Sequence, residues 1–285
     1  MRTVARPLSP EDLDLALLTP CLASDAQIYL KNRIEEERER LSVGKGELAE
    51  GEFFGLFSSQ GLELLAWFDR GGALVLSSGD PEAVKPLRRL CLGSYRGLRV
   101  LIGSGGPVQR LTELLGNKVE TPLCRSQPFL VLDSPEGLGP TCSVRPGNEE
   151  DLPWLVSANL RLNDEDLGVE PARVDSVLLT QRIRDRFERG YTWVLDEGGR
   201  PVCKLDIGSC GTHGALIEGV FTEPEARGRG HATSLVSSVS KALLETYPRV
   251  GLHVGRENLP AVRAYQHAGF REAEDFWLVR LEWGL

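Results

Sequence analysis

One stretch of the sequence decides the fold, and it reads Val220-Phe221-Thr222-Glu223-Pro224-Glu225-Ala226-Arg227-Gly228-Arg229-Gly230-His231-Ala232. It joins a predicted strand, about 215–222, to a predicted helix, about 230–246. The glycines of this turn have no side chain that would keep a phosphate away from the backbone N–H groups, and the helix that begins here adds the positive end of its dipole. We therefore expect an anion to bind at this turn.

The predicted helix after the turn is amphipathic. Its apolar residues on one face are Ala232, Leu235, Val236, Val239, Ala242 and Leu243. This spacing is typical of a helix that packs against a sheet. Such packing holds the first turn of the helix in place, so the expected anion site is preorganised.

The turn resembles the acyl-CoA motif of the GNAT N-acetyltransferase superfamily, Q/R-x-x-G-x-G/A, through Arg227, Gly230 and Ala232. The superfamily also has an Asn before a helix that carries Tyr and ends in Gly-Phe, and the chain supplies Asn258, Tyr265, Gly269 and Phe270. The preceding Val220-x-Thr222-x-Pro224 resembles the branch of glycine N-acyltransferase-like proteins and their bacterial relatives. The motifs span about 214–270. The predicted element order, from a strand at 142–145 to a last strand at 276–282, extends the resemblance over about 142–285.

Two other phosphate-binding motifs do not fit the turn. A Walker-type loop ends in G-K-S/T, whereas His231 follows Gly230 here. A dinucleotide fingerprint needs a third glycine at the position that Thr233 occupies. Acyl-CoA, which the resemblance implies, therefore remains the expected anion.

The resemblance implies an acyl-CoA-dependent N-acyltransferase, most simply an N-acetyltransferase, in which an amine attacks the thioester of acetyl-CoA or another acyl-CoA directly. The cofactor-binding positions that it implies are Val220, Phe221, Thr222, Arg227, Gly228, Arg229, Gly230, His231, Ala232, Thr233, Asn258 and Tyr265. Amides of the turn would hold the pyrophosphate, with the guanidinium groups of Arg227 and Arg229 as added charge. The backbone of the strand would pair with pantetheine, and one amide would polarise the thioester carbonyl.

Two residues are candidates for moving protons. Tyr265 lies where the superfamily places the hydroxyl that protonates the departing thiolate. Glu218 alternates with Val220 and Thr222 along the predicted strand, so we expect all three on one face, with the carboxylate able to take the amine proton directly or through water. His213, His231 and His253 are the other candidate bases because histidine titrates near neutral pH.

Several of these assignments have a purely structural alternative. Arg229 is equally a solvent-facing charge, Asn258 a turn residue before Pro260, and Tyr265 a core aromatic. Spacing alone does not separate these roles. A non-catalytic CoA-binding or regulatory module is the alternative function, because a fold does not guarantee chemistry.

The 285 residues are enough for two domains. Ser134, Pro135, Gly137, Gly139 and Pro140 interrupt any regular element after the apolar run 129–132. We predict an N-terminal domain over 1–138 and a catalytic domain over 139–285. The expected fold class is α/β (α+β), with a mixed central sheet, helices on both faces and a tandem GNAT arrangement.

The N-terminal part repeats the element order of the C-terminal part without its motif. Predicted strands near 53–57, 63–68 and 73–76 precede a helix to about 92, a strand 98–102, a helix 107–115 and a strand 128–132. The third strand continues into Ser77-Ser78-Gly79-Asp80-Pro81, which lacks R-x-x-G-x-G/A. We therefore expect a degenerate GNAT-like half that has lost acyl-CoA binding, with a substrate-covering domain as the alternative.

The composition of the chain limits the kinds of partner that it can bind. The net charge of −8 opposes nucleic-acid binding, no apolar run approaches the ~18 residues of a membrane span, and no signal peptide is evident, so we expect a cytoplasmic protein. The six cysteines form no C-x-x-C pair, which indicates reduced, mostly buried thiols and no metal site. The expected partner is a small-molecule or peptide amine, and the sequence does not indicate an oligomeric state.

Overall fold

The computed structural model describes residues 3–43, 50–95 and 97–284. The chain forms two compact units, one of Met1–Phe129 with Ala273–Leu285 and the other of Leu130–Glu272. We call them unit 1 and unit 2. Each is built on a mixed sheet of seven strands.

Unit 2 contains the stretch that opened the sequence analysis. Its elements are β8 (Arg145–Pro146), α5 (Leu152–Leu167), α6 (Ser176–Glu188), β9 (Thr192–Glu197), β10 (Arg200–Gly211), β11 (Gly214–Thr222), α7 (His231–Leu244), β12 (Val250–His253), α8 (Leu259–His267) and β13 (Arg271–Glu274). With β7 (Phe129–Leu132), the sheet has the order β13-β7-β12-β11-β10-β9-β8. The strand expected at 142–145 is reduced to β8, and β13 was not expected.

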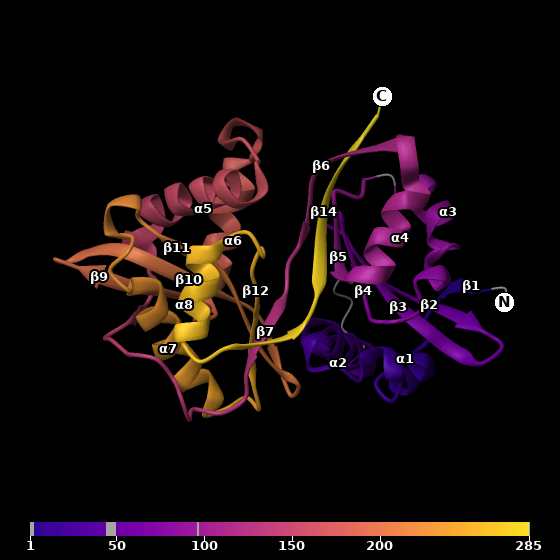
Figure 1. Ribbon diagram of the computed structural model, residues 1–285, viewed down its shortest axis with the longest axis horizontal. Coiled ribbons are helices and arrows are strands. Elements are labelled where there is room, and N and C mark those ends of the chain that lie inside the picture. Colours follow the sequence, from indigo (N-terminus) through magenta and orange to yellow (C-terminus); the bar gives the residue numbers. More distant parts are fainter. Residues whose placement is uncertain (1–2, 44–49, 96, 285) are drawn as a thin grey trace. The chain divides into compact units, whose positions relative to one another are not determined.

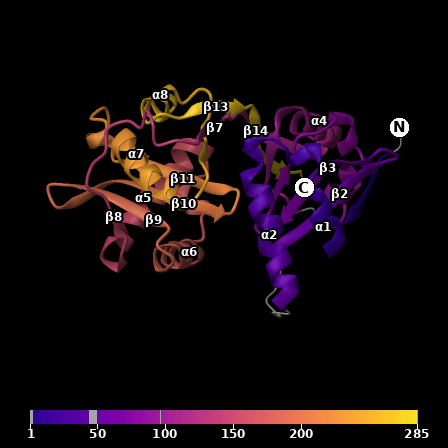
Figure 2. The ribbon, with the colours of Figure 1, turned by 90° about the horizontal axis from the view of Figure 1, so that it is seen from below.

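Helices cover both faces of this sheet, as predicted. The neighbours Val194 and Leu195 on β9 point to opposite faces, as successive strand residues do. Val194 packs in the cluster formed by α5 and α6, and Leu195 packs in the cluster that contains the apolar face of α7. Figure 2 shows α6 and α8 on opposite sides of strands β9 to β11.

Unit 1 has the same succession of elements. They are β1 (Val4–Pro7), α1 (Pro10–Ala16), α2 (Ile28–Val43), β2 (Gly51–Ser58), β3 (Gly61–Asp69), β4 (Ala73–Leu76), α3 (Leu87–Leu92), β5 (Val100–Ser104), α4 (Gly105–Leu115) and β6 (Val119–Ser126). Its sheet has the order β1-β2-β3-β4-β5-β14-β6, where β14 spans Phe276–Trp283. β1, α1 and β6 were not expected from the sequence.

The two units exchange a strand. β14, the last strand of the chain, lies between β5 and β6 of unit 1, with Leu278 opposite Ile102 on one side and Arg125 on the other. Figure 1 shows it, in the yellow of the C-terminus, beside the strands of that sheet. β7 takes the corresponding place between β12 and β13 of unit 2.

The exchange differs from the domain boundary predicted at 138/139. That boundary placed the strand at 276–282 in the C-terminal domain and the strand at 128–132 in the N-terminal one. Residue pattern identified both strands, but alternation indicates which residues of a strand face a core and does not indicate which sheet the strand joins. Unit 1 is therefore built from two separate stretches of the chain, whereas unit 2 is one continuous stretch.

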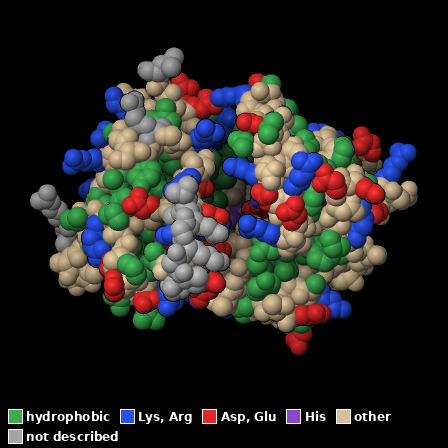
Figure 3. All heavy atoms as spheres, turned by 180° about the vertical axis from the view of Figure 1, so that it is seen from behind, with side chains coloured by type: hydrophobic (Ala, Val, Ile, Leu, Met, Phe, Trp, Pro, Cys, Tyr) green, Lys and Arg blue, Asp and Glu red, His purple; other side chains and the backbone are tan. Residues whose placement is uncertain are grey.

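The cysteines agree in part with the expectation of reduced, mostly buried thiols. All six cysteines are free; Cys21, Cys91 and Cys203 are buried, whereas Cys124 and Cys142 are exposed. Acidic and basic side chains are interspersed on the face shown in Figure 3. Across residues 3–43, 50–95 and 97–284, no helix has the length and apolar character to cross a membrane, and no three metal-ligating side chains gather.

Candidate acyl-CoA site

A cavity opens in unit 2 where two parallel strands part. β11 pairs with β12 from Ala215, opposite Val250, to Ile217, opposite Leu252, and then continues to Thr222 paired with β10 but not with β12. The cavity has a volume of about 600 Å³ and is bounded by the end of β11, the turn after it and the first turns of α7 and α8. This volume is within the range of small-molecule and cofactor sites, about 300–1,000 Å³.

Most of the predicted site residues line this cavity. They are Val220, Phe221, Thr222, Arg227, Gly228, Gly230, His231, Ala232, Thr233, Asn258 and Tyr265. Glu218 and Arg229 do not line it. The structure thus brings together the strand, the turn and the Asn–Tyr helix, which are up to 45 residues apart in the sequence (265 − 220).

The turn after β11 has the geometry of an anion site. Gly228 and Gly230 have φ angles of +76° and +81°, which disfavour other residues, and a Cβ at either position would have no neighbour within 4 Å. Gly230 caps α7 without a side-chain acceptor. The first amides of the helix, at 231–233, have no intrahelical partner and adjoin the cavity, so an anion placed there would satisfy them.

The arginines of the turn are engaged by acidic side chains. The Nε of Arg227 donates to the carbonyl of Thr222 at 3.0 Å, and its Nη2 lies 2.8 Å from a carboxylate oxygen of Glu165. Arg229 pairs with Glu197 at 3.0 Å. Of the two expected positive charges, only Arg227 borders the cavity, so the backbone amides remain the main anion donors.

Asn258 has a structural role at the same time as it borders the cavity. Its side-chain oxygen accepts a hydrogen bond from the amide of Ala261 at 3.2 Å and so caps α8. The cap fixes the start of the helix that carries Tyr265. The side-chain oxygen of Asn258 therefore has the structural role that the sequence left open as an alternative.

Tyr265 is a core aromatic with one end at the cavity. It is 7% exposed and packs in the cluster beneath α7, yet it lines the cavity wall. Burial raises the pKa of its hydroxyl, and the nearby Cys203 and Asp166 raise it further. The phenol is therefore protonated at neutral pH, as a proton donor to a thiolate must be.

Glu218 does not share a face with Val220 and Thr222 as expected, because β11 contains a bulge. Asp206 of β10 pairs with Glu218, but Lys204, two residues away, pairs with Phe221, three residues away. Gly219, with φ of +59°, accommodates the extra residue. Glu218 and Phe221 therefore share one face of the sheet, and Val220 and Thr222 lie on the other.

Contacts on the two faces agree with this register. The hydroxyl of Thr222 lies 3.1 Å from the thiol of Cys203, which belongs to the core beneath α7. Glu218 instead forms an ion pair with Arg186 of α6. Of the three candidate histidines, only His231 lines the cavity, and its Nε2 lies 3.5 Å from Glu197.

The sequence analysis missed the parts of the site that come from α5 and from the exposed side of α8. Leu162, Glu165 and Asp166 line the cavity from α5, and Arg263 lines it from α8. The residues on α5 precede the motif by more than fifty positions, and no local pattern connects them to it. Arg263 lies between Asn258 and Tyr265, so the helical pattern after the Asn could have indicated it.

Unit 1 differs from unit 2 at the corresponding place. β4 and β5 remain paired over all of β4, from Ala73 to Leu76, and a Cβ on Gly103 would be 2.2 Å from the carbonyl oxygen of Leu76. Just beyond, the hydroxyls of Ser78 and Ser104 each donate to Glu274 at 2.7 Å. The strands therefore stay together where those of unit 2 part.

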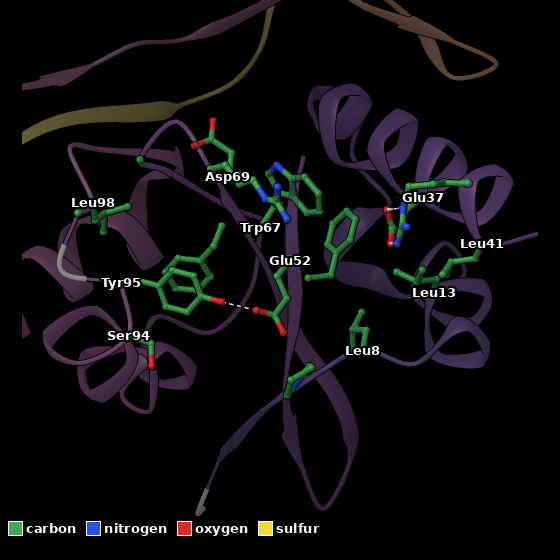
Figure 4. Close-up of a pocket in the computed structure, with 18 residues that line it drawn as sticks. Leu8, Leu13, Glu37, Leu41, Glu52, Trp67, Asp69, Ser94, Tyr95 and Leu98 are labelled. Atoms are coloured by element: carbon green, nitrogen blue, oxygen red, sulfur yellow. Dashed lines mark hydrogen bonds and ion pairs between the residues drawn. The ribbon is translucent and has the colours of Figure 1, made fainter. Parts of the chain in front are cut away.

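Unit 1 has a cavity of about 580 Å³ at the other end of its sheet. It lies where β2 begins and β3 ends, and Figure 4 shows Trp67, Asp69 and Glu52 around it, with the Tyr95 hydroxyl hydrogen-bonded to Glu52. The cavity borders neither Ser78 nor Ser104. It is therefore not the counterpart of the cavity in unit 2.

Comparison with known protein families agrees with this geometry. Residues 159–270 match the model of the acetyltransferase (GNAT) family. The match runs from the middle of α5 past the end of α8 and includes the turn and most of the cavity wall. All of the matched residues lie in unit 2. No curated protein sequence matches the chain.

Solved structures resemble the whole chain. A GCN5-related N-acetyltransferase from Sphaerobacter thermophilus is 17% identical, with a TM-score of 0.55 over 98% of this chain and 95% of that one. A tandem GNAT protein from the clavulanic acid biosynthesis pathway is 13% identical, with a TM-score of 0.52 over 99% and 98%. A Drosophila protein is 14% identical, with a TM-score of 0.67 over 98% and 99%. The predicted tandem GNAT fold is confirmed.

Proposed function

We propose that this protein transfers an acyl group, most simply acetyl, from CoA to an amine, and that unit 2 alone binds the acyl-CoA. The observation that carries the proposal is the cavity at the parting of β11 and β12, with the open glycine turn and the start of α7 at its edge. Unit 1 lacks both features among its described residues. The degenerate-half interpretation of unit 1 is part of the proposal.

The residues present fit acyl-CoA. The amides at 231–233 and the side-chain-free surface of Gly228 and Gly230 suit a pyrophosphate. The strand edge of β11 beyond Ile217 is unpaired by β12 and can pair with the amide groups of pantetheine. The thioester would then lie between Val220 and the hydroxyl of Tyr265, two residues that border the same cavity.

In the proposed reaction the chain contributes three effects. The turn and the strand orient the thioester, which makes the attack of a bound amine effectively intramolecular. A backbone N–H of the bulged segment stabilises the negative charge that develops on the carbonyl oxygen. Tyr265 donates its proton to the departing thiolate, and water carries the proton of the amine, because Glu218 lies on the opposite face of the sheet.

We propose only the chemical class of the acceptor, an amine. The Val220-x-Thr222-x-Pro224 approach supports a branch similar to glycine N-acyltransferase-like proteins. Glycine, other amino acids, polyamines and peptide N-termini are therefore the first amines to assay.

A non-catalytic CoA-binding module is the second candidate. The observation in its favour is that Glu218, the carboxylate expected to act as the base, does not line the cavity. Incubation with acetyl-CoA, an amine panel and a thiol reagent separates the two functions. Release of CoA only when an amine is present supports the transferase, and CoA binding without release supports the module.

Glu218→Gln is expected to leave the pH profile of kcat/KM unchanged. Its carboxylate is paired with Arg186 on the face of the sheet opposite to Val220, so removing its charge removes no proton acceptor from the cavity. The profile is measured over pH 6–9 with the amine that turns over fastest. A flattened alkaline rise in this variant would instead restore Glu218 as the base.

A further inference from the structure

A group of charged side chains is buried between the sheet of unit 2 and the helices α5 and α6. Lys204 is 0% exposed and Asp206 is 2% exposed, and their Nζ and Oδ2 atoms are 2.5 Å apart. Asp206 also accepts from Thr192 at 2.8 Å and from Arg186 at 3.0 Å, and Lys204 donates to Asn159 of α5 at 3.1 Å. We call these five residues the buried polar cluster.

The charges of the cluster come at a cost in stability. Burial alone would raise the pKa of Asp206, but the positive charges of Lys204 and Arg186 outweigh it and hold the pKa below its ordinary value. Taking such ions out of water costs several kcal/mol each, and apolar residues often replace a buried ion pair without loss of stability. The contacts of the cluster with β11 indicate a role other than stability.

The cluster touches the bulge of β11. A Cβ on Gly219 would lie 2.7 Å from the Oδ2 of Asp206 and 3.0 Å from the Nζ of Lys204, so the backbone of Gly219 rests directly on the ion pair. Arg186 extends the contact to Glu218, the residue before the bulge. Two successive residues of β11 are thus held from the same side.

The bulge determines what the cavity presents to a thioester. Without the extra residue, strict alternation would place Val220 and Thr222 on the face of Glu218, away from the core beneath α7. A bulge also leaves one residue out of the strand pairing, and the register passes from Glu218 to Phe221 without pairing Gly219 or Val220. The amide that would donate to an acyl carbonyl is therefore sought in this segment, as the proposed function requires.

We propose that Lys204 and Asp206 are positioning residues for acyl transfer, which hold the Gly219 bulge so that the amide beside it points at the acyl carbonyl. The proposal rests on the proposed function. It assigns the ion pair no contact with substrate, because neither residue lines the cavity. Its effect should therefore appear in the rate of the acyl-transfer step and not in the binding of acyl-CoA at the glycine turn.

The test is Lys204→Met, which keeps a long side chain and removes the charge. We expect kcat to fall roughly 10–100-fold, somewhat less than the ~10²–10³-fold that follows loss of an oxyanion-stabilising donor. The calorimetric Kd for CoA should stay within about twofold, because neither Lys204 nor Asp206 lines the cavity, and kcat is expressed per CoA-binding molecule. Asp206→Asn, which preserves shape, should lower kcat in the same direction and serves if Lys204→Met does not fold.

Arg145→Met is the matched control. Arg145 pairs with Asp151 and Asp196 at the far edge of the same sheet, where β8 meets β9, and has no contact with β11. It should lower the Tm without lowering kcat. The proposal is overturned if Lys204→Met and Asp206→Asn retain full kcat, or if Arg145→Met lowers kcat as much as they do. Failure of the proposed function is a different result, in which the wild-type protein binds CoA and acylates no amine.

Discussion

Gly230→Asp is expected to abolish CoA binding while the fold persists. The new side chain would stand in the open space beside the turn, since a Cβ at this position meets no atom within 4 Å. Its carboxylate would face the pyrophosphate at the start of α7. Two like charges 4 Å apart repel by about 4 kcal/mol at an effective dielectric constant of about 20, which corresponds to a rise in Kd of roughly 1,000-fold. Calorimetry with CoA measures this change.

Gly230→Asn is the control for that variant. Asparagine is nearly the same size as aspartate, carries no charge and tolerates the left-handed backbone that φ of +81° requires. We expect a smaller loss of affinity, because only the steric part of the effect remains. Equal affinity for CoA in wild-type protein and a folded Gly230→Asp variant would show that the anion does not bind at this turn.

Tyr265→Phe is expected to lower kcat with little change in the affinity for CoA. Tyr265 lines the cavity while it packs in the core, so removal of the hydroxyl alone leaves that packing in place. General-acid catalysis contributes about 10²–10⁴-fold, and water replaces part of it, so the expected loss is ~10–1,000-fold. Because the raised pKa keeps this phenol protonated, kcat should show no fall from its ionisation near neutral pH.

Tyr247→Phe is the matched control for the tyrosine. Tyr247 packs against the same core, and a hydrogen bond to Cys210 together with burial raises its pKa to about 12, but it does not line the cavity. This variant should keep full kcat. Full kcat in Tyr265→Phe as well would mean that the chain works by positioning the amine against the thioester and leaves the thiolate to water.

The turn at residues 227–233 shows how much of the site the sequence could predict. Its glycines have positive φ angles and open surroundings, which only a residue without a side chain provides, so local sequence and local structure coincide. The helix α8 could be predicted in the same way, because Asn258 caps the helix that carries Tyr265. Local motifs therefore predicted the cavity wall and the family fold.

Glu218 and β14 show what the sequence could not predict. A bulge inserts one residue and reverses every later side chain, and a glycine in a strand indicates such a site without fixing it. The exchange of β7 and β14 depends on contacts between residues more than a hundred positions apart, such as Leu278 with Ile102. The alternation of apolar residues along a strand does not indicate which strands it pairs with.

The account's central claim is acyl transfer from CoA to an amine at the cavity of unit 2. Its most direct test is mass spectrometry of the amine after incubation with isotopically labelled acetyl-CoA, for wild-type protein and for Gly230→Asp. The account predicts a labelled acetyl group on an amine of the panel with the wild-type protein and almost none with the variant. Labelled product at equal rates from both proteins, or none from a wild-type protein that binds CoA, would contradict it.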